Sequence, residues 1–289
     1  MTQARATGIG FGAVILWALL ALLTVKSAPT PPLLLNTLCF AIGGSCGLVW
    51  MLWTGGLSRL RAVPLRVYLF GTLGLFGYHA LYFSALRLAP AAEAGLIAYL
   101  WPLLIVVMSG LLPGERVRPG HLLGALIGFA GAALIIAGDS GGLSAGHLPG
   151  YALALICALT WSSYSVLSRY VGAAPTETVA IFCIGSAALS LPLHLMFEQT
   201  IWPPSLTAWV ATILLGLGPV GFAFFIWDIG MKKGDIQLLG AASYAAPLLS
   251  TLVLILAGTA AFSPQLSVAA VLITGGAAIA ARASFRSPD

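Results

Sequence analysis

Two ten-residue stretches that lie 145 positions apart share one residue pattern. The first is Gly95-Leu-Ile-Ala-Tyr-Leu-Trp-Pro-Leu-Leu104, and the second is Gly240-Ala-Ala-Ser-Tyr-Ala-Ala-Pro-Leu-Leu249. Matches among Ala, Gly and Leu are expected by chance in any apolar chain, but the shared Tyr-x-x-Pro-Leu-Leu is a stronger coincidence. The same shift places Gly71 on Gly216 and Pro119 on Pro264, and Trp17 meets Trp161 one residue out of that register. The pattern indicates an internal duplication.

The composition excludes an aqueous globule. Of the 289 residues, 60% are hydrophobic and only 7% are charged, whereas a soluble domain has roughly 25% charged residues. The mean hydropathy is +1.01. All four cysteines lie inside apolar runs, so a secreted disulfide framework is excluded as well. The sequence therefore predicts an integral membrane protein.

The apolar runs predict an all-α membrane protein with ten transmembrane helices. A crossing helix needs about 20 mostly apolar residues, and a β-barrel would instead show alternating polarity. The loops between the runs hold only a few residues, so no separate extramembrane domain is expected. The predicted spans are 7–26, 32–53, 66–86, 92–112, 120–137, 149–168, 177–197, 207–228, 236–257 and 264–282.

The basic residues predict the orientation of these spans. Cytoplasmic loops carry an excess of Lys and Arg. With the N-terminus inside, the outer loops hold only Lys26 and Arg87, and both termini are cytoplasmic. The inner loops then hold Arg5, Arg59, Arg61, Arg66, Arg116, Arg118, Arg169, Lys232, Lys233, Arg282 and Arg286. The net charge of +5 thus reflects topology, and no basic patch indicates a nucleic-acid partner.

The duplication divides the chain into two five-helix units, residues 1–140 and 141–289. Because five is odd, the second unit must enter the membrane from the opposite side, so the repeats are predicted to be inverted. Inverted repeats are typical of secondary transporters, which bind substrate near the midplane and rock to exchange access. One chain holds both halves of the pair and forms one transport unit, so a monomer suffices.

The end of the first unit is similar to a known family. The stretch Leu111-Leu-Pro-Gly-Glu115-Arg-Val-Arg-Pro-Gly-His-Leu-Leu-Gly124 precedes a glycine-bearing helix and resembles the EamA family of the drug/metabolite transporter superfamily. In the second unit the matching position is Ala260, which departs from that pattern. The Tyr- and Trp-rich middle of the chain is similar to bacterial aromatic amino-acid exporters. The resemblance implies a multi-pass protein of the bacterial inner membrane that exports amino acids.

The tryptophans and tyrosines fall into two groups. Half lie near span ends, where interfacial belts form: Trp50, Trp53, Tyr68, Tyr151, Tyr170, Trp202, Trp209 and Trp227. The others lie near span centres: Trp17, Tyr78, Tyr82, Tyr99, Trp101, Trp161, Tyr164 and Tyr244. Lipid offers no partner for their polar atoms, so the central rings should face the bundle interior. Two interpretations stay open, a ring-lined cavity for a bulky substrate and ordinary helix packing.

Other central residues add to this candidate substrate site. His79 is an ionisable residue at mid-span, either a functional group or an interhelical hydrogen-bond donor. Pro102 and Pro247 occupy equivalent positions and are predicted hinges. Each should free a carbonyl, on Ala98 and Ser243, that can meet a substrate ammonium. Asp228, before Lys232 and Lys233, is interpreted as pairing locally at the interface, and Glu93 marks the outer start of the fourth span.

These features predict a secondary transporter or facilitator that exports amino acids, aromatic ones in particular, and is not an enzyme. No Walker A pattern occurs, and neither a cofactor nor a metal site is predicted. Exporters of other metabolites or drugs are the alternative within transport. The first span, Gly8 to Val25, lacks the acidic residue on which small multidrug-resistance proteins rely. Two alternatives come from other classes of protein, and both are disfavoured. An intramembrane enzyme would need converging catalytic groups, and a scaffold would leave the internal repeat unexplained.

Overall fold

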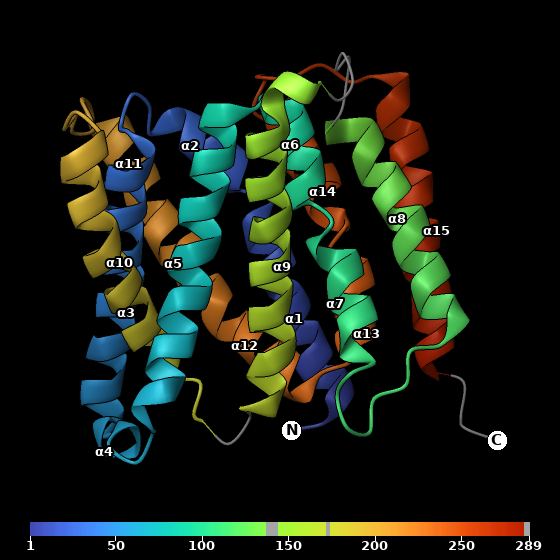
Figure 1. The fold of residues 1–289 in the computed structure, drawn as a ribbon, viewed down its shortest axis with the longest axis horizontal. Coiled ribbons are helices and arrows are strands. Elements are labelled where there is room, and N and C mark those ends of the chain that lie inside the picture. The colour runs from blue at the N-terminus through green and yellow to red at the C-terminus, as the bar shows by residue number, and fades with distance from the viewer. Residues whose placement is uncertain (137–143, 172–173, 286–289) are drawn as a thin grey trace.

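The computed structural model describes residues 1–136, 144–171 and 174–285 (Figure 1). The regular elements within these ranges are all helical. Alone or joined end to end, they form ten helical segments that are long and apolar enough to cross a membrane. Both the helical class and the ten spans predicted from the sequence are confirmed. The predicted division at residues 140 and 141 lies outside the described residues.

The spans have the following bounds, and one short helix, α4 (Leu57–Leu60), lies outside them. Six spans are α3 (Pro32–Thr54), α5 (Leu65–Leu88), α8 (Pro119–Ile136), η1 (Ala145–His147) with α9 (Leu148–Tyr170), α10 (Thr178–Phe197) and α15 (Pro264–Phe285). Four are interrupted, namely α1 (Gln3–Trp17) with α2 (Leu20–Lys26), α6 (Ala91–Ala98) with α7 (Trp101–Ser109), α11 (Leu206–Leu217) with η2 (Gly218–Phe222) and α12 (Ala223–Lys233), and α13 (Ile236–Ala242) with α14 (Ala245–Leu256).

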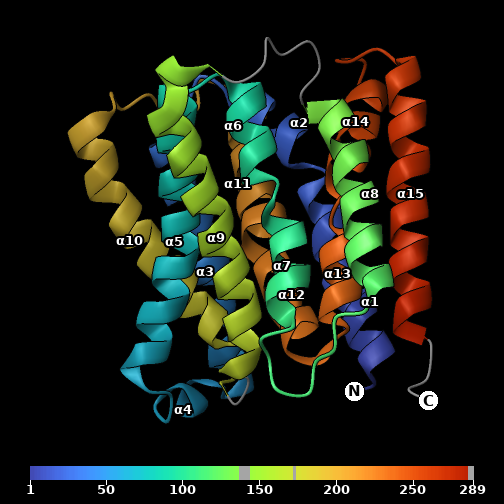
Figure 2. The same ribbon diagram turned by 45° about the vertical axis from the view of Figure 1, so that its right-hand side comes forward.

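Helix α1 begins, and α15 ends, at the same end of the bundle, the lower end in Figures 1 and 2. We call this the inner end and the opposite one the outer end. An even number of crossings requires this arrangement. Helix α9, which opens the second predicted unit, starts at the outer end and so runs opposite to α1. Which end faces the cytoplasm stays a prediction.

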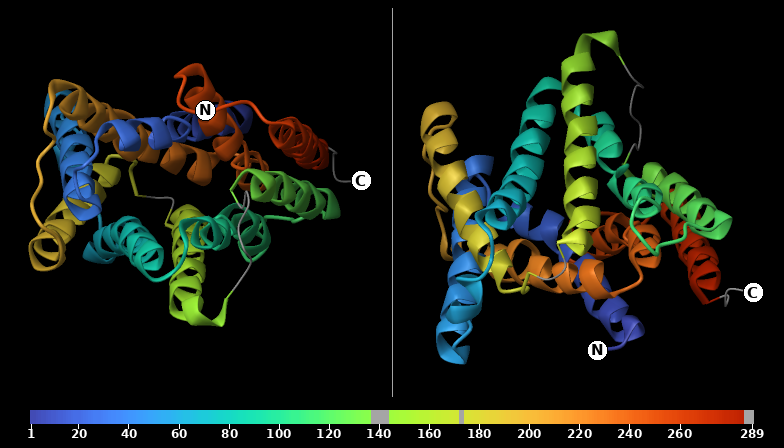
Figure 3. Two further views of the ribbon diagram at one scale, coloured as in Figure 1. Left: turned by 90° about the horizontal axis from the view of Figure 1, so that it is seen from above. Right: turned by 60° about the horizontal axis from the view of Figure 1, so that its bottom comes forward.

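The largest helix contacts are symmetric between the two predicted units: replacing each helix by its counterpart in the other unit gives another contacting pair. Helix α8 packs along α15, as seen from above in Figure 3, and α3 packs along α10. The contact of α1 with α12 is matched by that of α9 with α5, and the contact of α3 with α11 by that of α10 with α5. The inverted repeat itself stays a prediction, but this pattern is consistent with it.

Glycines on α8 allow it to approach α15 closely. A side chain on Gly124 would collide with the backbone of Gly276, and one on Gly131 would lie 3.0 Å from the carbonyl oxygen of Ala269. These two contacts map onto each other under the 145-residue shift. Small residues serve this purpose in membrane helices because they let backbones meet. The glycines therefore pack within the chain and do not form an open face for a second copy.

Two spans are interrupted just before their prolines. The breaks fall at Tyr99 and Leu100, before Pro102, and at Ser243 and Tyr244, before Pro247. One detail of the sequence prediction is wrong, since the Ser243 carbonyl is not free but accepts the N–H of Ala246 at 3.1 Å. At the break the backbone forms a hydrogen bond between residues three apart, and this bond occupies the Ser243 oxygen. Whether the breaks act as hinges stays a prediction.

The eighth span contains an irregular turn and ends later than predicted. A turn of π-helix, η2, holds Pro219 and separates α11 from α12. The span continues to Lys233, five residues beyond the predicted end at 228. Trp227 therefore lies six residues before the end of the span and not at it.

Candidate functional site

The eight central tryptophans and tyrosines, together with His79, form one connected set of ring contacts. Trp17 lies at its centre, with ring centroids 6.0 Å from Trp101 and 5.9 Å from Trp161. Trp161 in turn contacts Tyr78 at 5.3 Å and Tyr164 at 5.4 Å. We call this set, with the three rings added below, the ring network. The sequence prediction named these nine residues as site candidates, and the structure brings them together.

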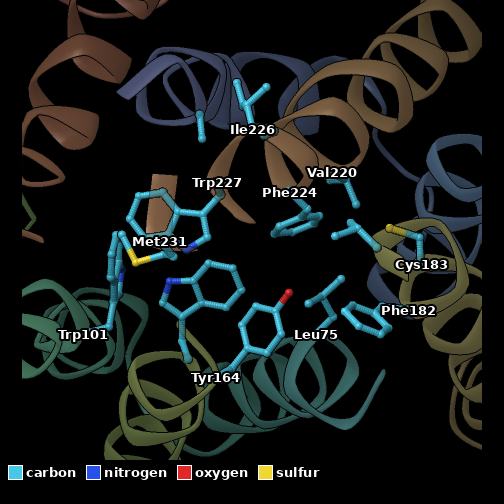
Figure 4. Close-up of a cluster of buried hydrophobic side chains, with 14 of the residues drawn as sticks. Leu75, Trp101, Tyr164, Phe182, Cys183, Val220, Phe224, Ile226, Trp227 and Met231 are labelled. Atoms are coloured by element: carbon cyan, nitrogen blue, oxygen red, sulfur yellow. The ribbon is translucent and has the colours of Figure 1, made fainter. Parts of the chain in front are cut away.

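The ring network is tightly closed toward the inner end. We call Trp161, Tyr164, Phe224 and Trp227 the inner ring group; each is at most 4% exposed. Figure 4 shows Trp227 and Phe224 of α12 directed toward Tyr164 of α9, with Trp101 of α7 closing one side. Close-packed rings of this kind are stabilised both by burial and by edge-to-face or offset contact.

The polar atoms of three rings in the network have partners inside the bundle, as expected from the sequence. Trp17 donates its indole N–H to the carbonyl of Pro219 at 3.1 Å, in the irregular turn η2. Trp227 donates to the hydroxyl of Ser165 at 3.1 Å. The hydroxyl of Tyr244 accepts the backbone N–H of Leu103 at 3.0 Å and so caps the start of α7. These bonds fix the orientation of the three rings, and Trp227 and Tyr244 are fully buried as well.

The outer ring group, Tyr78, His79, Tyr82 and Tyr99, is more loosely packed. All four side chains are only partly buried. Tyr78 and Tyr82 stand one turn apart on α5 with their rings nearly parallel and 6.2 Å between centroids. Tyr99 reaches the rest of the network through Trp101 at 6.1 Å and Tyr244 at 6.4 Å. This group leaves ring surface available at the outer side of the network.

His79 hydrogen bonds within its own helix. Its Nδ1 lies 2.8 Å from the carbonyl oxygen of Leu75, one turn earlier on α5. A carbonyl can only accept, so Nδ1 carries the proton in the neutral ring, and Nε2 is left as an acceptor. This bond lies within α5, so it is not the interhelical hydrogen bond that the sequence suggested for His79. The ring also contacts Phe40 at 5.0 Å.

Sequence reasoning missed three rings of the network. Trp227 was expected at the interface, but it is 1% exposed and contacts Trp17 at 5.1 Å. The cause is the longer eighth span, which places this residue well inside the helix end. Phe40 and Phe224 stack at 5.7 Å in the same region. Phenylalanine carries no polar atom, so nothing in the sequence distinguishes a buried one from a lipid-facing one.

Five other rings assigned to the interface are exposed, which agrees with their place near span ends. They are Trp50, Trp53, Tyr170, Trp202 and Trp209.

The remaining candidates are placed as follows. The Ser243 hydroxyl donates to the Leu239 carbonyl of its own helix at 2.7 Å. Asp228 pairs with Lys232 at 2.9 Å, which confirms local pairing, but their side chains are only 2% and 6% exposed, so the pair is buried rather than interfacial. Glu93 lies at the start of α6 and is also buried; its Oε2 has no hydrogen-bond partner among the described residues.

Glu115, singled out by the family resemblance, is part of an ion-pair cluster at the inner end. Its carboxylate contacts the guanidinium of Arg169, at the end of α9, and accepts from Gln237 of α13 at 2.9 Å. Arg169 also donates to the carbonyl of Met231 on α12 at 2.7 Å. These bonds connect three spans and the loop before α8, which holds the inner end together.

Groups of three or more His, Cys, Asp or Glu side chains that could hold a metal ion do not occur in the part of the chain that the structure describes.

Three comparisons relate this chain to known proteins. The EamA-like transporter family matches residues 6–137 and 148–282. A protein of Ancylobacter novellus named aromatic amino acid exporter YddG is 54% identical over 97% of this chain and 98% of its own length. The protein of the same name from Escherichia coli K12 is 25% identical, with 96% of each chain covered. A solved crystal structure at 52% identity has a TM-score of 0.93 and covers 99% of this chain and 100% of its own.

Proposed function

Since the chain belongs to the EamA-like transporter family, we propose that it is a carrier that exports amino acids, aromatic ones in particular. The observation that carries this proposal is the ring network, which connects helices of both predicted units near the middle of the spans. An aromatic side chain can replace one ring contact with another at little cost, because stacked and edge-to-face geometries are interchangeable in energy. The names of the two relatives support the same substrate class.

The mechanism that fits this site is alternating access. The network is closed on the side of the inner ring group and partly exposed on the side of the outer ring group. A carrier needs that asymmetry in one state and its reverse in the other. The paired breaks at Pro102 and Pro247 would act as hinges, and the two matched stretches of the family would form the two units of an inverted repeat.

The substrate's charged groups would bind where the helices are irregular. His79 Nε2 offers an acceptor, and the break before Pro102 offers backbone groups to an ammonium. Driving energy would come from the substrate gradient or an ion rather than from ATP. The protein would lie in the bacterial inner membrane with both termini cytoplasmic and would act as a monomer. An enzyme is not favoured, because the family and the named relatives are transporters.

The test is uptake of radiolabelled phenylalanine into proteoliposomes that hold the purified protein, without ATP and without an ion gradient. Uptake that equilibrates, and that excess tryptophan inhibits, is the expected result. Empty liposomes serve as the control. Absence of uptake, repeated with an imposed proton gradient, would contradict the amino-acid proposal and favour another metabolite or drug as substrate.

A further inference from the structure

The two ends of the bundle are closed to different degrees. At the inner end α12 packs against α9, and α13 packs against α7. Under the predicted repeat, the corresponding contacts at the outer end would join α5 to α2 and α6 to α14. Within the described residues neither of these pairs packs together in this way. Figures 1 and 2 show both α2 and α6 at the outer end, which is thus the end where helices have to meet when the protein changes state.

Charged groups complete the closed inner end. The inner ion-pair cluster consists of Glu115, between α7 and α8, Arg169, in the last turn of α9, and Gln237, in the first turn of α13. Arg169 also donates to the carbonyls of Met231, at 2.7 Å, and Gly234, both at the end of α12. A cation is favoured there because the carbonyl end of a helix is electronegative. One guanidinium thus joins the ends of two helices to a carboxylate of the other predicted unit.

The outer end has the corresponding positions but not the same residues. The 145-residue shift places Ala260 where the inner cluster has its carboxylate and Thr24 where it has its guanidinium. Neither charge is therefore repeated at its own position. A cation and a carboxylate stand close to these elements instead, since Lys26 is the last residue of α2 and Glu93 lies in the first turn of α6, the helix that corresponds to α13.

Both of these outer groups lack a partner in this structure. Glu93 is 8% exposed, and its Oε2 has no hydrogen-bond partner among the described residues, although an unsatisfied buried polar atom costs free energy. Lys26 is exposed and forms no ion pair within the described part of the chain. Arg87, the other basic residue predicted for the outer loops, already binds Glu198 at 3.1 Å. Among the described Lys and Arg residues of the outer end, Lys26 is the one left for Glu93.

We propose that Lys26 and Glu93 form an ion pair when the outer end closes, and that this pair takes the place of the inner ion-pair cluster in that state. The inference rests on the proposed function, in particular on alternating access. Closure would bring the ammonium of α2 to Glu93 Oε2 on α6. One contact forms as the other breaks, so neither state is left with a large excess of stability, which a carrier that populates both states requires.

The first experiment tests whether the two positions meet. Lys26→Cys and Glu93→Cys are introduced together with Cys46→Ser, because Cys46 is the exposed one of the four cysteines. Copper phenanthroline should oxidise the new pair to a disulfide in the purified full chain, and the loss of two maleimide-reactive thiols after denaturation measures it. Val25→Cys with Glu93→Cys is the matched control. Its cysteine lies one position away on the same turn, so it should react about tenfold more slowly.

The rate of this cross-link should also depend on the inner end. Glu115→Gln weakens the inner ion-pair cluster, so the population with a closed outer end should rise and the disulfide should form severalfold faster. Two positions that are simply neighbours in every state would react at the same rate with and without Glu115→Gln. That result would overturn the inference, and so would the absence of a cross-link.

Charge reversal tests the pair in the working transporter. Lys26→Glu and Glu93→Lys should each slow phenylalanine exchange in proteoliposomes about tenfold, because like charges then meet at the closing end. The double reversal should restore exchange to within about threefold of the unaltered protein. Val25→Glu adds the same charge one residue earlier and should leave exchange unchanged. A double reversal as slow as the slower single variant would overturn the inference.

The two experiments keep the outcomes distinguishable. Should Glu93→Lys fail to fold, the cross-link decides the case, since it needs no buried lysine. A protein that forms the cross-link faster in Glu115→Gln but does not transport phenylalanine would contradict the proposed substrate and not the ion pair. A protein that transports phenylalanine but shows neither the cross-link nor the rescue would contradict the ion pair alone.

Discussion

The inner and outer ring groups are both built from aromatic side chains but differ in how firmly they are held. Trp161, Tyr164 and Trp227 are nearly inaccessible, whereas Tyr78 and Tyr82 are partly exposed. In the inner ring group Trp227 also donates to the hydroxyl of Ser165 at 3.1 Å. The comparison suggests two roles for aromatic residues: the rings of one group carry the packing, and the partly exposed rings of the other are those we propose for contact with a substrate.

Small residues explain how the inner ring group closes so completely. A side chain on Gly74 of α5 would collide with the ring of Tyr164, and one on Gly71 would collide with the ring of Phe182. Glycine at these positions lets each ring pack directly against the backbone of α5. Tyr78, His79 and Tyr82 of the outer ring group project from α5 itself and are only partly buried, so we expect them to move apart at lower cost.

The largest expected effect is on the inner ring group. Trp227→Ala should lower the free energy of unfolding by about 3 kcal/mol or more, because it leaves a cavity and removes the bond to Ser165. Denaturation of the purified protein in detergent measures this change. Trp53→Ala, at an 86% exposed position, should change stability little. Similar values for the two variants would remove the distinction between packing rings and exposed ones.

The second prediction concerns the outer ring group. Tyr82→Ala should raise the KM for phenylalanine about threefold to tenfold, since it removes one aromatic contact of roughly 0.5–1.5 kcal/mol. Threonine transport should change less, because threonine has no ring to lose. Tyr82→Phe keeps the ring and should retain most of the phenylalanine transport. Equal losses for phenylalanine and threonine would count against aromatic recognition by this group.

The third prediction addresses the paired breaks. Pro102→Ala and Pro247→Ala should each slow turnover while leaving the KM for phenylalanine nearly unchanged, because a restored backbone hydrogen bond stiffens the break. Initial rates over a range of substrate concentrations separate the two parameters. Pro149→Ala, in the first turn of α9, is the control and should not alter turnover. A changed KM with unchanged turnover would assign the prolines to binding rather than to motion.

The smallest expected effect is at Ser243. Its hydroxyl bonds to the Leu239 carbonyl, which already accepts the backbone N–H of residue 243 at 3.0 Å. Removing the hydroxyl therefore leaves no buried group without a partner, and Ser243→Ala should keep phenylalanine transport within about twofold. A large loss, measured in the same proteoliposome assay, would show that this hydroxyl contacts the substrate after all.

Much of the fold follows from local sequence. The ten spans need only runs of apolar residues, and the breaks near Pro102 and Pro247 need only the loss of a backbone donor. The central rings were also identified correctly as a group, since a buried Trp or Tyr needs an interior partner. The details that failed depend on geometry: the Ser243 carbonyl is occupied because the chain tightens at its break.

The sequence by itself determined that this protein is a ten-helix membrane protein with aromatic residues gathered at mid-span, because length, hydropathy and ring position can be read along one dimension. Only the tertiary structure decided that Trp227 belongs to the inner ring group, that Phe40 and Phe224 complete the network, and that Asp228 and Lys232 form a buried pair. Those outcomes depend on where the eighth span ends and on contacts between helices distant in sequence. The face that a residue presents to another helix is set by packing, which no single segment encodes.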